Sequence, residues 1–344
     1  MFLKHLYLRH FRNHKEAEWE FSSGLNLILG PNGRGKTNLL EAIYLISTGR
    51  SFRTAHLNEL IEERAPFLYI EAIIDNGPTI QLSLDRSQKK KVQIDGKESS
   101  VWSSLIGLLP VVLFAPTDVD LIDGAPILRR RFLNLHLAQS DPVYVHHFIR
   151  FERAMKQRNA QLKSGRLEGI DCWEVEMERS AAYLHSARTS LIDDLKEPLK
   201  QEGLSLFAEN KDAAIRFHPG HAKKYLEQLV KQRSKEQLLG VTLSGPHRDD
   251  LSFTLAGKEA GPFASEGEKR TFICALKMAE WRRLQSKVGL LPIMAIDDCL
   301  GPLDRNRQQA MAKALQSLGQ VFVTAPVETD VFHKPNVIRL IYHL

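Results

Sequence analysis

A glycine-rich segment near the start of the chain has the residue types and spacing of a phosphate-binding loop. Residues 30–37 have the sequence Gly-Pro-Asn-Gly-Arg-Gly-Lys-Thr, which fits the pattern G-x-x-x-x-G-K-[ST]. Glycines let backbone N–H groups surround phosphate oxygens, and the N-terminus of the following helix adds partial positive charge. In this pattern Lys36 contacts the β- and γ-phosphates, and the Thr37 hydroxyl binds Mg²⁺. We therefore expect ATP and Mg²⁺ as cofactors, bound by Gly30, Pro31, Asn32, Gly33, Arg34, Gly35, Lys36, Thr37 and Asn38.

Two acidic residues near the end of the chain complete this pattern. Residues 293–296 are apolar and are followed directly by Asp297 and Asp298. In P-loop ATPases, an acid of this kind supplies a carboxylate to Mg²⁺. We expect Asp297 to hold Mg²⁺ and Asp298 to activate or position the attacking water, so the candidate catalytic residues are Asp298 and Lys36. The alternative is a strand end that only meets solvent.

A serine–glycine turn precedes this acidic pair in the chain. Ser265 and Gly267 stand at the start of a predicted helix that runs through Trp281, and a helix N-terminus is an anion-binding feature. The position of the turn resembles the signature motif of ABC-type ATPases. That resemblance implies that Ser265 and Gly267 contact the γ-phosphate of ATP bound to a second protomer. A simpler role is helix capping, with Ser265 and Glu268 as a capping box, and both roles are compatible.

The hydrophobic pattern predicts that an α/β fold positions these motifs. A buried strand at 24–29 leads into the glycine-rich loop, and a helix at 38–46 follows it. Alternating runs broken by turn residues predict antiparallel hairpins, a β-meander, over 68–94. Further strands are predicted at 2–8, 108–114, 292–296 and 321–323.

The middle of the chain has a different pattern and is predicted to be mainly helical. Apolar residues recur there at helical spacing up to Leu195, which predicts a long helix that ends at Pro198. A shorter helix before it, connected through residues 164–171, would complete a helical hairpin. We therefore predict two domains, an ATPase head formed by 1–114 plus 241–344 and a helical arm formed by 115–240.

Composition excludes several classes of protein. The chain has 344 residues, of which 43% are hydrophobic and 26% charged, as is typical of a globular protein. The net charge of +6 is compatible with nucleic-acid binding and equally compatible with a mildly basic enzyme. Neither an apolar run of about 18 residues nor a signal peptide is found, so we expect no membrane span and a cytoplasmic location.

Apart from Mg²⁺, no metal is predicted. The segment with His247, Asp249 and Asp250 has one histidine and two acids, a weak metal signal, and is expected to be a structural or switching element of the head. Three cysteines are too far apart for a metal cluster or a disulfide framework. They are Cys172, Cys274 and Cys299.

Several short basic runs are candidate DNA contacts. Phosphate binding by such runs would make affinity fall steeply with salt, whereas the alternative is an ordinary solvated surface. No aromatic residues alternate with these runs, so base-specific contacts are not expected. The candidate DNA-binding residues are Lys89, Lys90, Lys91, Arg129, Lys223 and Lys224.

Taken together, the motifs resemble the RecF family of SMC-like ATPases over nearly the whole chain. Segments that follow the RecF pattern in order are LYLRHFRNH, GPNGRGKTNLLEAIYLISTGRSFR, LFAPTDVDLIDGAPILRRRFLN and SGPHRDDLSF. The resemblance implies an ABC/SMC-like P-loop ATPase head with an antiparallel β-meander and an inserted, mainly helical arm. By analogy with SMC-like heads, it implies that Arg12 and Asn13 contact the nucleotide.

The same resemblance implies a function in DNA metabolism. It predicts an ATP-dependent homodimer on single-stranded DNA and gapped duplexes, with a RecR-like mediator protein as partner. Weak, DNA-stimulated ATP hydrolysis without nuclease activity would reset this clamp. The implied cellular roles are DNA replication, gap repair and SOS induction.

The chain departs from the ABC pattern at a few positions. Glu268 stands where the signature motif usually has Gln, which places another negative charge beside the phosphate of the second protomer. Gly301 and Pro302 replace the more usual Ser-Glu of the D-loop. Thr324 occupies the switch position, where many ABC ATPases have His.

Three other functions remain open at this point. A transport-coupling ABC ATPase would need a membrane partner and usually a switch histidine, which Thr324 does not supply. A P-loop kinase or small-molecule NTPase would turn over as a monomer, would need a substrate pocket, and would make the turn at Ser265 accidental. An ATP-gated DNA-binding adaptor would use the same binding residues with negligible hydrolysis. Asp298→Asn separates the adaptor from the ATPase, because a trapped ATP dimer is expected only of the ATPase.

Overall fold

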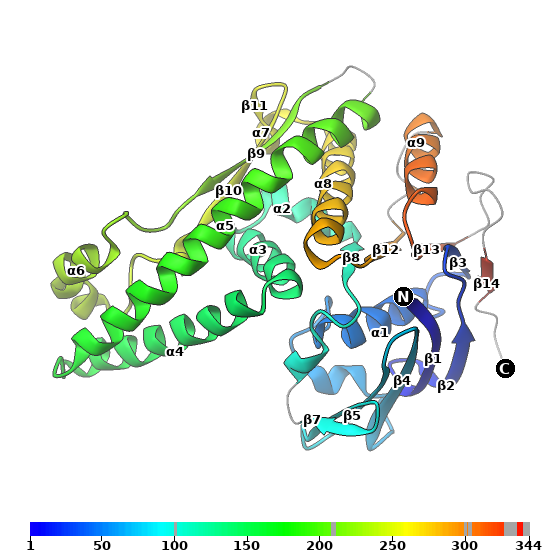
Figure 1. Ribbon diagram of the computed structural model, residues 1–344, viewed down its shortest axis with the longest axis horizontal. Coiled ribbons are helices and arrows are strands. Elements are labelled where there is room, and N and C mark those ends of the chain that lie inside the picture. Colours follow the sequence, from blue (N-terminus) through cyan, green and yellow to red (C-terminus); the bar gives the residue numbers. More distant parts are fainter. Residues whose placement is uncertain (100–101, 208–210, 299–300, 302–304, 327–335, 340–344) are drawn as a thin grey trace. The chain divides into compact units, whose positions relative to one another are not determined.

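The chain forms two compact units (Figure 1). The computed structural model describes residues 1–99, 102–207, 211–298, 301, 305–326 and 336–339. The first unit comprises Met1–Asp118, Ser205–Ala208 and Glu266–Leu344, and the second comprises Val119–Leu204 and Glu209–Ser265.

This division differs from the expected one in three segments. Residues 115–118 and 205–207 group with the first unit rather than with the arm, and the expected head includes residues 241–265. Residues 241–265 group with the second unit because β10 (Asp250–Leu255) pairs antiparallel with β9 (Ala213–His218). The strand β9 itself lies in the segment that was expected to be helical.

The first unit contains an antiparallel sheet of six strands. Its order is β2-β1-β4-β5-β6-β7, and each neighbouring pair is antiparallel. Along β4 and β5 every second side chain is buried, as expected of a sheet with one face on the core. The predicted β-meander is therefore confirmed. The strands are β1 (Phe2–Phe11), β2 (His14–Glu20), β4 (Phe67–Asp75), β5 (Thr79–Asp85), β6 (Lys90–Ile94) and β7 (Lys97–Ser99).

A second sheet in the first unit is parallel throughout, with the order β14-β3-β13-β12-β8. The three central strands are almost wholly buried, which explains their continuous apolar sequences. Since parallel strands share one carboxyl edge, the residues that follow β3 and β12 meet at that edge. The strands are β3 (Leu25–Leu29), β8 (Val111–Phe114), β12 (Ile293–Asp297), β13 (Val321–Ala325) and β14 (Asn336–Arg339).

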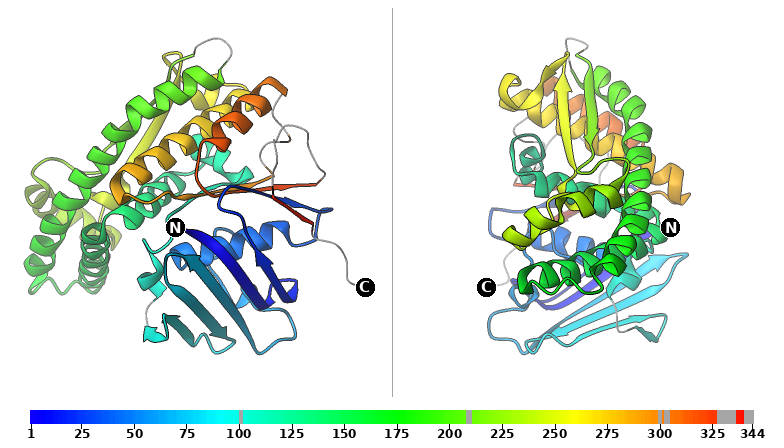
Figure 2. Two further views of the ribbon diagram at one scale, coloured as in Figure 1. Left: turned by 45° about the vertical axis from the view of Figure 1, so that its right-hand side comes forward. Right: turned by 90° about the vertical axis from the view of Figure 1, so that its left-hand side faces the viewer.

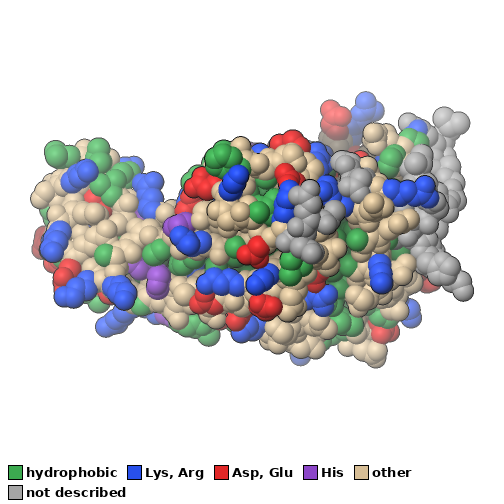
Figure 3. All heavy atoms as spheres, turned by 90° about the horizontal axis from the view of Figure 1, so that it is seen from above, with side chains coloured by type: hydrophobic (Ala, Val, Ile, Leu, Met, Phe, Trp, Pro, Cys, Tyr) green, Lys and Arg blue, Asp and Glu red, His purple; other side chains and the backbone are tan. Residues whose placement is uncertain are grey.

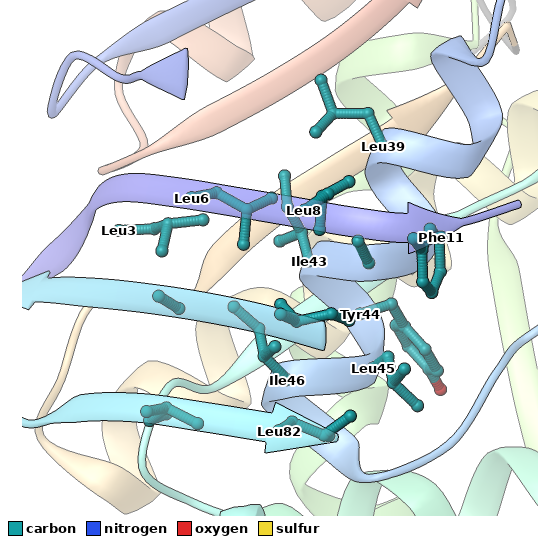
Figure 4. Packing of buried hydrophobic residues seen from close by; sticks show 14 of the residues in the cluster. Leu3, Leu6, Leu8, Phe11, Leu39, Ile43, Tyr44, Leu45, Ile46 and Leu82 are labelled. Carbon is teal, nitrogen blue, oxygen red and sulfur yellow. The ribbon is translucent and has the colours of Figure 1, made fainter. Parts of the chain in front are cut away.

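Helix α1 (Lys36–Thr48) lies between these two sheets (Figure 2). Side chains of β1, such as Leu6 and Leu8, meet Ile43 and Leu45 of α1 in one hydrophobic core (Figure 4). Ile28 and Ala295 of the parallel sheet belong to the same core. The N-terminus of α1 is thereby fixed at the carboxyl edge of the parallel sheet. The other helices of the first unit are α8 (Glu266–Val288) and α9 (Arg305–Gln316).

The second unit is mainly helical and is built on a long hairpin of α4 and α5, as predicted. The predicted end at Pro198 is wrong, because α5 continues through this proline to Leu206. Leu195 and Leu199 are fully buried on either side of Pro198, so packing outweighs the lost backbone hydrogen bond. The helices are α2 (Asp120–Asp123), α3 (Pro126–Ser140), α4 (Pro142–Ser164), α5 (Ile170–Leu206), α6 (Tyr225–Leu239) and α7 (Ala260–Phe263), and a small sheet has the order β11-β10-β9, with β11 at Lys258–Glu259.

Short 3₁₀ turns complete the fold, and no helix within the described ranges is long and apolar enough to cross a membrane. The turns are η1 (Leu57–Leu60), η2 (Trp102–Leu105), η3 (Pro116–Val119) and η4 (Pro246–Arg248).

Buried ion pairs hold the second unit together. Arg158 is fully buried and lies 3.0 Å from a carboxylate oxygen of Glu174 and 2.6 Å from one of Glu236. Arg188 lies 2.6 Å from Asp249, and both side chains are buried. Such charges are tolerated in a protein interior because each is paired.

The segment from His247 to Asp250 was expected to be an element of the head. It lies in the second unit instead, because Asp249 forms the buried ion pair with Arg188 of α5.

Candidate nucleotide-binding site

The glycine-rich loop connects β3 to the N-terminus of α1, as the motif requires. Gly33 and Gly35 have φ angles of 82° and 92°, which favour glycine. A Cβ on Gly35 would lie 2.6 Å from Asn13 Oδ1 and 2.6 Å from His14 Nε2, so no larger residue fits without displacement.

His14 supports this loop from β2. Its Nε2–H donates to the Gly35 carbonyl oxygen at 3.2 Å. Burial lowers the pKa of His14, which keeps the ring neutral. The sequence analysis did not identify His14 as a site residue. The one sequence feature that points to it is its position directly after Arg12 and Asn13.

Lys36 lies over the loop with its ammonium group held by the loop itself. Its Nζ donates to the carbonyl oxygens of Gly30 at 2.5 Å and Pro31 at 3.1 Å, and lies 3.5 Å from Asn32 Oδ1. All three acceptors are uncharged, so phosphate oxygens would compete well for these donors.

Thr37 and Asp297 meet across the carboxyl edge of the parallel sheet. The Thr37 hydroxyl donates to Asp297 Oδ1 at 2.9 Å, although the two residues are 260 positions apart. The Thr324 hydroxyl donates to the same oxygen at 2.9 Å and accepts from the Asp298 backbone N–H, also at 2.9 Å. Thr324 thus links the two acidic residues, and Asp298 has a φ angle of 49°.

The environment of Asp297 suits a cation. Burial raises the pKa of this carboxyl, and the hydrogen bonds from Thr324 and Thr37 oppose that shift. Mg²⁺ prefers oxygen ligands and commonly uses one or two carboxylates together with substrate phosphates. The Thr37 hydroxyl and the Asp297 carboxylate therefore fit the predicted Mg²⁺ ligands.

Arg12 has a different environment from the one expected of a nucleotide contact. Its guanidinium forms a bidentate pair with the buried Glu41, at 2.9 and 2.8 Å, and donates to the Glu59 carbonyl oxygen at 2.8 Å. Ser51 also donates to Glu41, at 2.5 Å. A nucleotide contact by Arg12 stays a prediction, and Glu41 is a residue that sequence reasoning missed.

A chain of polar contacts joins Asn13 to the loop and to Arg53. The Asn38 amide donates to Asn13 Oδ1 at 2.7 Å, and the Asn13 amide lies 3.4 Å from the Gly33 carbonyl oxygen. Arg53 donates to Asn38 Oδ1 at 2.6 Å. Arg53 was not predicted as a site residue, although it is the last residue of the segment GPNGRGKTNLLEAIYLISTGRSFR, which follows the RecF pattern.

Two neighbouring cavities open at this edge of the first unit. One, of about 340 Å³, brings together most of the predicted phosphate and Mg²⁺ residues, and Arg53 joins them. The other, of about 600 Å³, is lined by Arg12 and Asn13 and shares Asn38 and Arg53 with the first. The first is lined by Asn32, Gly33, Gly35, Lys36, Thr37, Asn38, Arg53, Asp297 and Asp298.

The predicted signature turn lies at the start of α8. Ser265 directly precedes the helix, and Gly267 lies in its first turn, where Glu266 and Glu268 favour the helix dipole. The Thr271 hydroxyl donates to the Gly267 carbonyl oxygen at 2.8 Å. The contact of this turn with ATP on a second protomer stays a prediction. Of the D-loop, Gly301 is exposed, and residues 302–304 lie outside the described residues.

All five candidate DNA-binding lysines are exposed. Lys90 lies at the β5–β6 hairpin with its Nζ 4.9 Å from the centre of the Trp102 ring, and Lys224 forms an exposed ion pair with Glu227 at 3.0 Å. The exposed residues are Lys89, Lys90, Lys91, Lys223 and Lys224.

Arg129 does not have the environment of a DNA contact, and this prediction is corrected. Its side chain is buried, forms a bidentate pair with Asp250 at 2.6 and 3.1 Å, and donates to the carbonyl oxygens of Leu121 and Gly124. All of these contacts lie within the second unit, so Arg129 has a structural role.

The phosphate-binding loop, the acidic strand end and the two sheets around α1 define a P-loop ATPase head of the ABC/SMC class. A family model described as the RecF/RecN/SMC N-terminal domain matches residues 2–343. The chain is 42% identical to the DNA replication and repair protein RecF of Protochlamydia amoebophila over 94% of each chain, and 35% identical to RecF of Chlamydia trachomatis serovar A over 94% of this chain and 92% of that one. The chain belongs to the RecF family.

Solved structures agree with this assignment. The recombination mediator protein RecF-ATPrS in the RecFOR pathway matches with a TM-score of 0.90 and 26% identity, over 99% of this chain and 96% of that one. An Smc head domain of Pyrococcus furiosus matches with a TM-score of 0.56 at 16% identity, over 96% of this chain and 90% of that one, and so shows the fold alone.

Proposed function

We propose that this protein binds ATP with Mg²⁺ at the loop of residues 30–37 and uses ATP to close a homodimer on DNA. Hydrolysis is slow and DNA-stimulated, and it reopens the dimer. The observation that carries this proposal is the 2.9 Å hydrogen bond between Thr37 and Asp297, which joins the loop to the acidic strand end. The RecF-ATPrS match supports ATP as the nucleotide.

Each site residue has a distinct role in this proposal. Lys36 exchanges its bonds to loop carbonyls for bonds to the β- and γ-phosphates. Thr37 and Asp297 hold Mg²⁺, which neutralises phosphate charge when bound. Asp298, exposed at the mouth of the cavity, positions the attacking water.

The second protomer completes the site in this proposal. Ser265 and Gly267 of that protomer contact the γ-phosphate, so a monomer alone turns over slowly. ATP favours the closed dimer because one ATP molecule can contact both protomers only when the dimer is closed.

DNA binding is the second part of the proposal. The exposed lysines at the β5–β6 hairpin and before α6 are the candidate contacts. On the face in Figure 3, Lys and Arg side chains are spread among Asp and Glu rather than gathered in one stripe. We therefore expect several small contacts to single-stranded DNA and gapped duplexes, and an affinity that falls with salt.

The cellular part of the proposal rests on the relatives named RecF. The protein acts in the cytoplasm with a RecR-like mediator in DNA replication, gap repair and SOS induction. The matched structure is described as a protein of the RecFOR pathway, and this description supports a RecR-like protein as the partner.

Solution mass by light scattering tests the dimer directly. Mass should double with ATP–Mg²⁺ but not with ADP or without nucleotide, and gapped duplex DNA should favour the dimer. Lys36→Met should abolish the doubling and weaken binding of a fluorescent ATP analogue, whereas Lys196→Met, exposed on α5, should change neither. Unchanged nucleotide affinity in Lys36→Met would refute the phosphate-site assignment.

The alternative is an ATP-gated DNA-binding adaptor with negligible hydrolysis. Asp298→Asn distinguishes the two functions, because it removes a carboxylate from the cavity mouth. The ATPase proposal predicts a dimer that stays closed with ATP in this variant. An adaptor predicts wild-type behaviour of both the dimer and the bound nucleotide.

A further inference from the structure

Thr324 lies beside both acidic residues of the nucleotide site. It stands in β13 directly opposite Asp297 of the neighbouring strand β12, and it is buried, with 2% of its surface exposed. A side chain that branches at Cβ has few rotamers in a strand, so the direction of its hydroxyl is restricted. The hydroxyl of Thr324 therefore has a defined place next to the two acids.

This hydroxyl makes two contacts of opposite kind. It donates to Asp297 Oδ1 and accepts from the backbone N–H of Asp298, each at 2.9 Å. A hydroxyl can do both at once because it has one hydrogen and two lone pairs, whereas an apolar side chain of the same shape can do neither. Both partners belong to the protein, so Thr324 would influence a bound nucleotide through them.

The two contacts differ in how easily they are replaced. The Thr37 hydroxyl donates to the same Asp297 oxygen at 2.9 Å, so this carboxylate keeps a donor when Thr324 loses its hydroxyl. The N–H of Asp298 has the hydroxyl of Thr324 as its acceptor. A partly buried N–H that loses its acceptor is costly, so removal of the hydroxyl should act mainly on Asp298.

Asp298 has a backbone conformation that needs support. It directly follows β12 and has a φ angle of 49°, which is unfavourable for a residue with a Cβ atom. Its side chain is exposed and lines the cavity of about 340 Å³. Such conformations persist where surrounding contacts fix them. Without the bond from its N–H, the Asp298 peptide can rotate toward the extended region, and this rotation turns the carboxylate out of its place.

We propose that Thr324 is a positioning residue for ATP hydrolysis. Its hydroxyl fixes the peptide of Asp298, and this peptide directs the Asp298 carboxylate toward the attacking water. The inference rests on the proposed ATPase function and assigns Thr324 to the hydrolysis step rather than to ATP binding. A purely structural Thr324 would instead influence stability and ATP affinity together.

Steady-state ATP hydrolysis in the presence of gapped duplex DNA tests the inference. Thr324→Val keeps the shape of the side chain but removes the hydroxyl, so kcat should fall about 10–100-fold, the effect of a misplaced catalytic group. Because hydrolysis is slow, KM reports ATP affinity and should change by less than about twofold. Thr324→Ser retains the hydroxyl and should keep kcat within about threefold of wild type, and Thr324→Cys, whose thiol is a weaker donor and acceptor, should lie between Ser and Val.

Thr48→Val is the matched control in the same unit. Thr48 is buried in α1, donates to the Tyr44 carbonyl oxygen at 2.8 Å and accepts from the Arg50 N–H at 3.3 Å. Its hydroxyl thus makes the same two kinds of contact without touching either acid. Thr48→Val should leave kcat unchanged.

The lifetime of the ATP dimer gives a second readout. Hydrolysis reopens the proposed dimer, so light scattering should show that the dimer of Thr324→Val persists longer than that of wild type. If Thr324→Val does not unfold cooperatively in urea, Thr324→Ser and Thr324→Cys provide the same comparison of kcat.

The outcomes separate the inference from the proposed function. Wild-type kcat in Thr324→Val or Thr324→Cys, a loss in Thr324→Ser as large as in Thr324→Val, or an equal loss of kcat and ATP affinity would overturn the inference and leave the ATPase proposal intact. Wild-type protein that binds ATP but does not hydrolyse it with DNA would overturn both.

Discussion

His247 should make the second unit lose stability in mild acid. Its Nε2–H donates to the Thr242 carbonyl oxygen at 3.1 Å, and burial lowers its pKa to about 4. Its Nδ1 is buried and has no hydrogen-bond partner in the described part of the chain. A proton added there would find no acceptor, whereas in the unfolded chain the ring binds a proton with an ordinary pKa of about 6.5.

The sign and size of the effect follow from the two pKa values. Above about pH 6.5 the ring is neutral in both states, so the full stability is present. As the pH falls, the unfolded state binds a proton first, and stability is lost down to about pH 4. The difference of about 2.5 pKa units corresponds to about 3 kcal/mol in total. About 2 kcal/mol of this is lost at pH ~5.

Urea unfolding followed by circular dichroism, at about pH 7.5 and about pH 5, measures this loss. His247→Gln retains a donor for Thr242 and cannot titrate, so wild-type protein should lose about 2 kcal/mol more than this variant between the two pH values. His146→Gln makes the same change at an exposed site of α4 and should behave as wild type. Equal losses in wild type and His247→Gln would refute the reasoning.

Three further predictions follow from the structure. Gly35→Ala places a methyl group 2.6 Å from two side-chain atoms and should abolish binding of a fluorescent ATP analogue. Gly33→Ala has open space around its Cβ and should only lower the free energy of unfolding, by about 1–2 kcal/mol in a denaturation experiment. Arg158→Met removes the ion-pair partner of the buried Glu236 and one of the two arginine partners of the buried Glu174, the other being Arg233. It should lower the free energy of unfolding in urea by about 3–5 kcal/mol, against less than about 1 kcal/mol for Arg150→Met in its exposed ion pair; equal losses would contradict the burial argument. Burial raises the pKa of the Cys274 thiol to about 12, so iodoacetamide should modify Cys274 only in denaturant, as peptide mass spectrometry would show, and rapid native labelling would contradict this.

The sequence predicted the parts of the fold that depend on local patterns. The glycine-rich loop has a fixed spacing, and β3 and β12 are short apolar runs beside it, so their order and role follow from the residues alone. The β-meander is signalled by turn residues at each break in the alternation.

The parts that the sequence did not predict depend on contacts between distant segments. The pairing of Arg129 with Asp250 turns a candidate DNA contact into an internal one, and nothing near Arg129 in the sequence indicates it. The pairing of Arg12 with Glu41 is equally invisible in the sequence, since the two residues are 29 positions apart. Pro198 is an end signal that tertiary packing overrides. His14 acts on the loop only because the start of β2 lies against Gly35, which is 21 positions away in the chain.

The strand order of the parallel sheet has a consequence for protein synthesis. Among the described strands, β3, which leads into the phosphate-binding loop, pairs only with β13 and β14, which come from the end of the chain. At roughly 5–20 residues per second, a ribosome needs some tens of seconds to pass from Thr37 to Asp297. During that time the nascent loop lacks both neighbouring strands and its acidic partner. A truncated chain that stops before β12 should therefore be unable to bind nucleotide. ATP should bind the nascent chain only after the last strands have been synthesised.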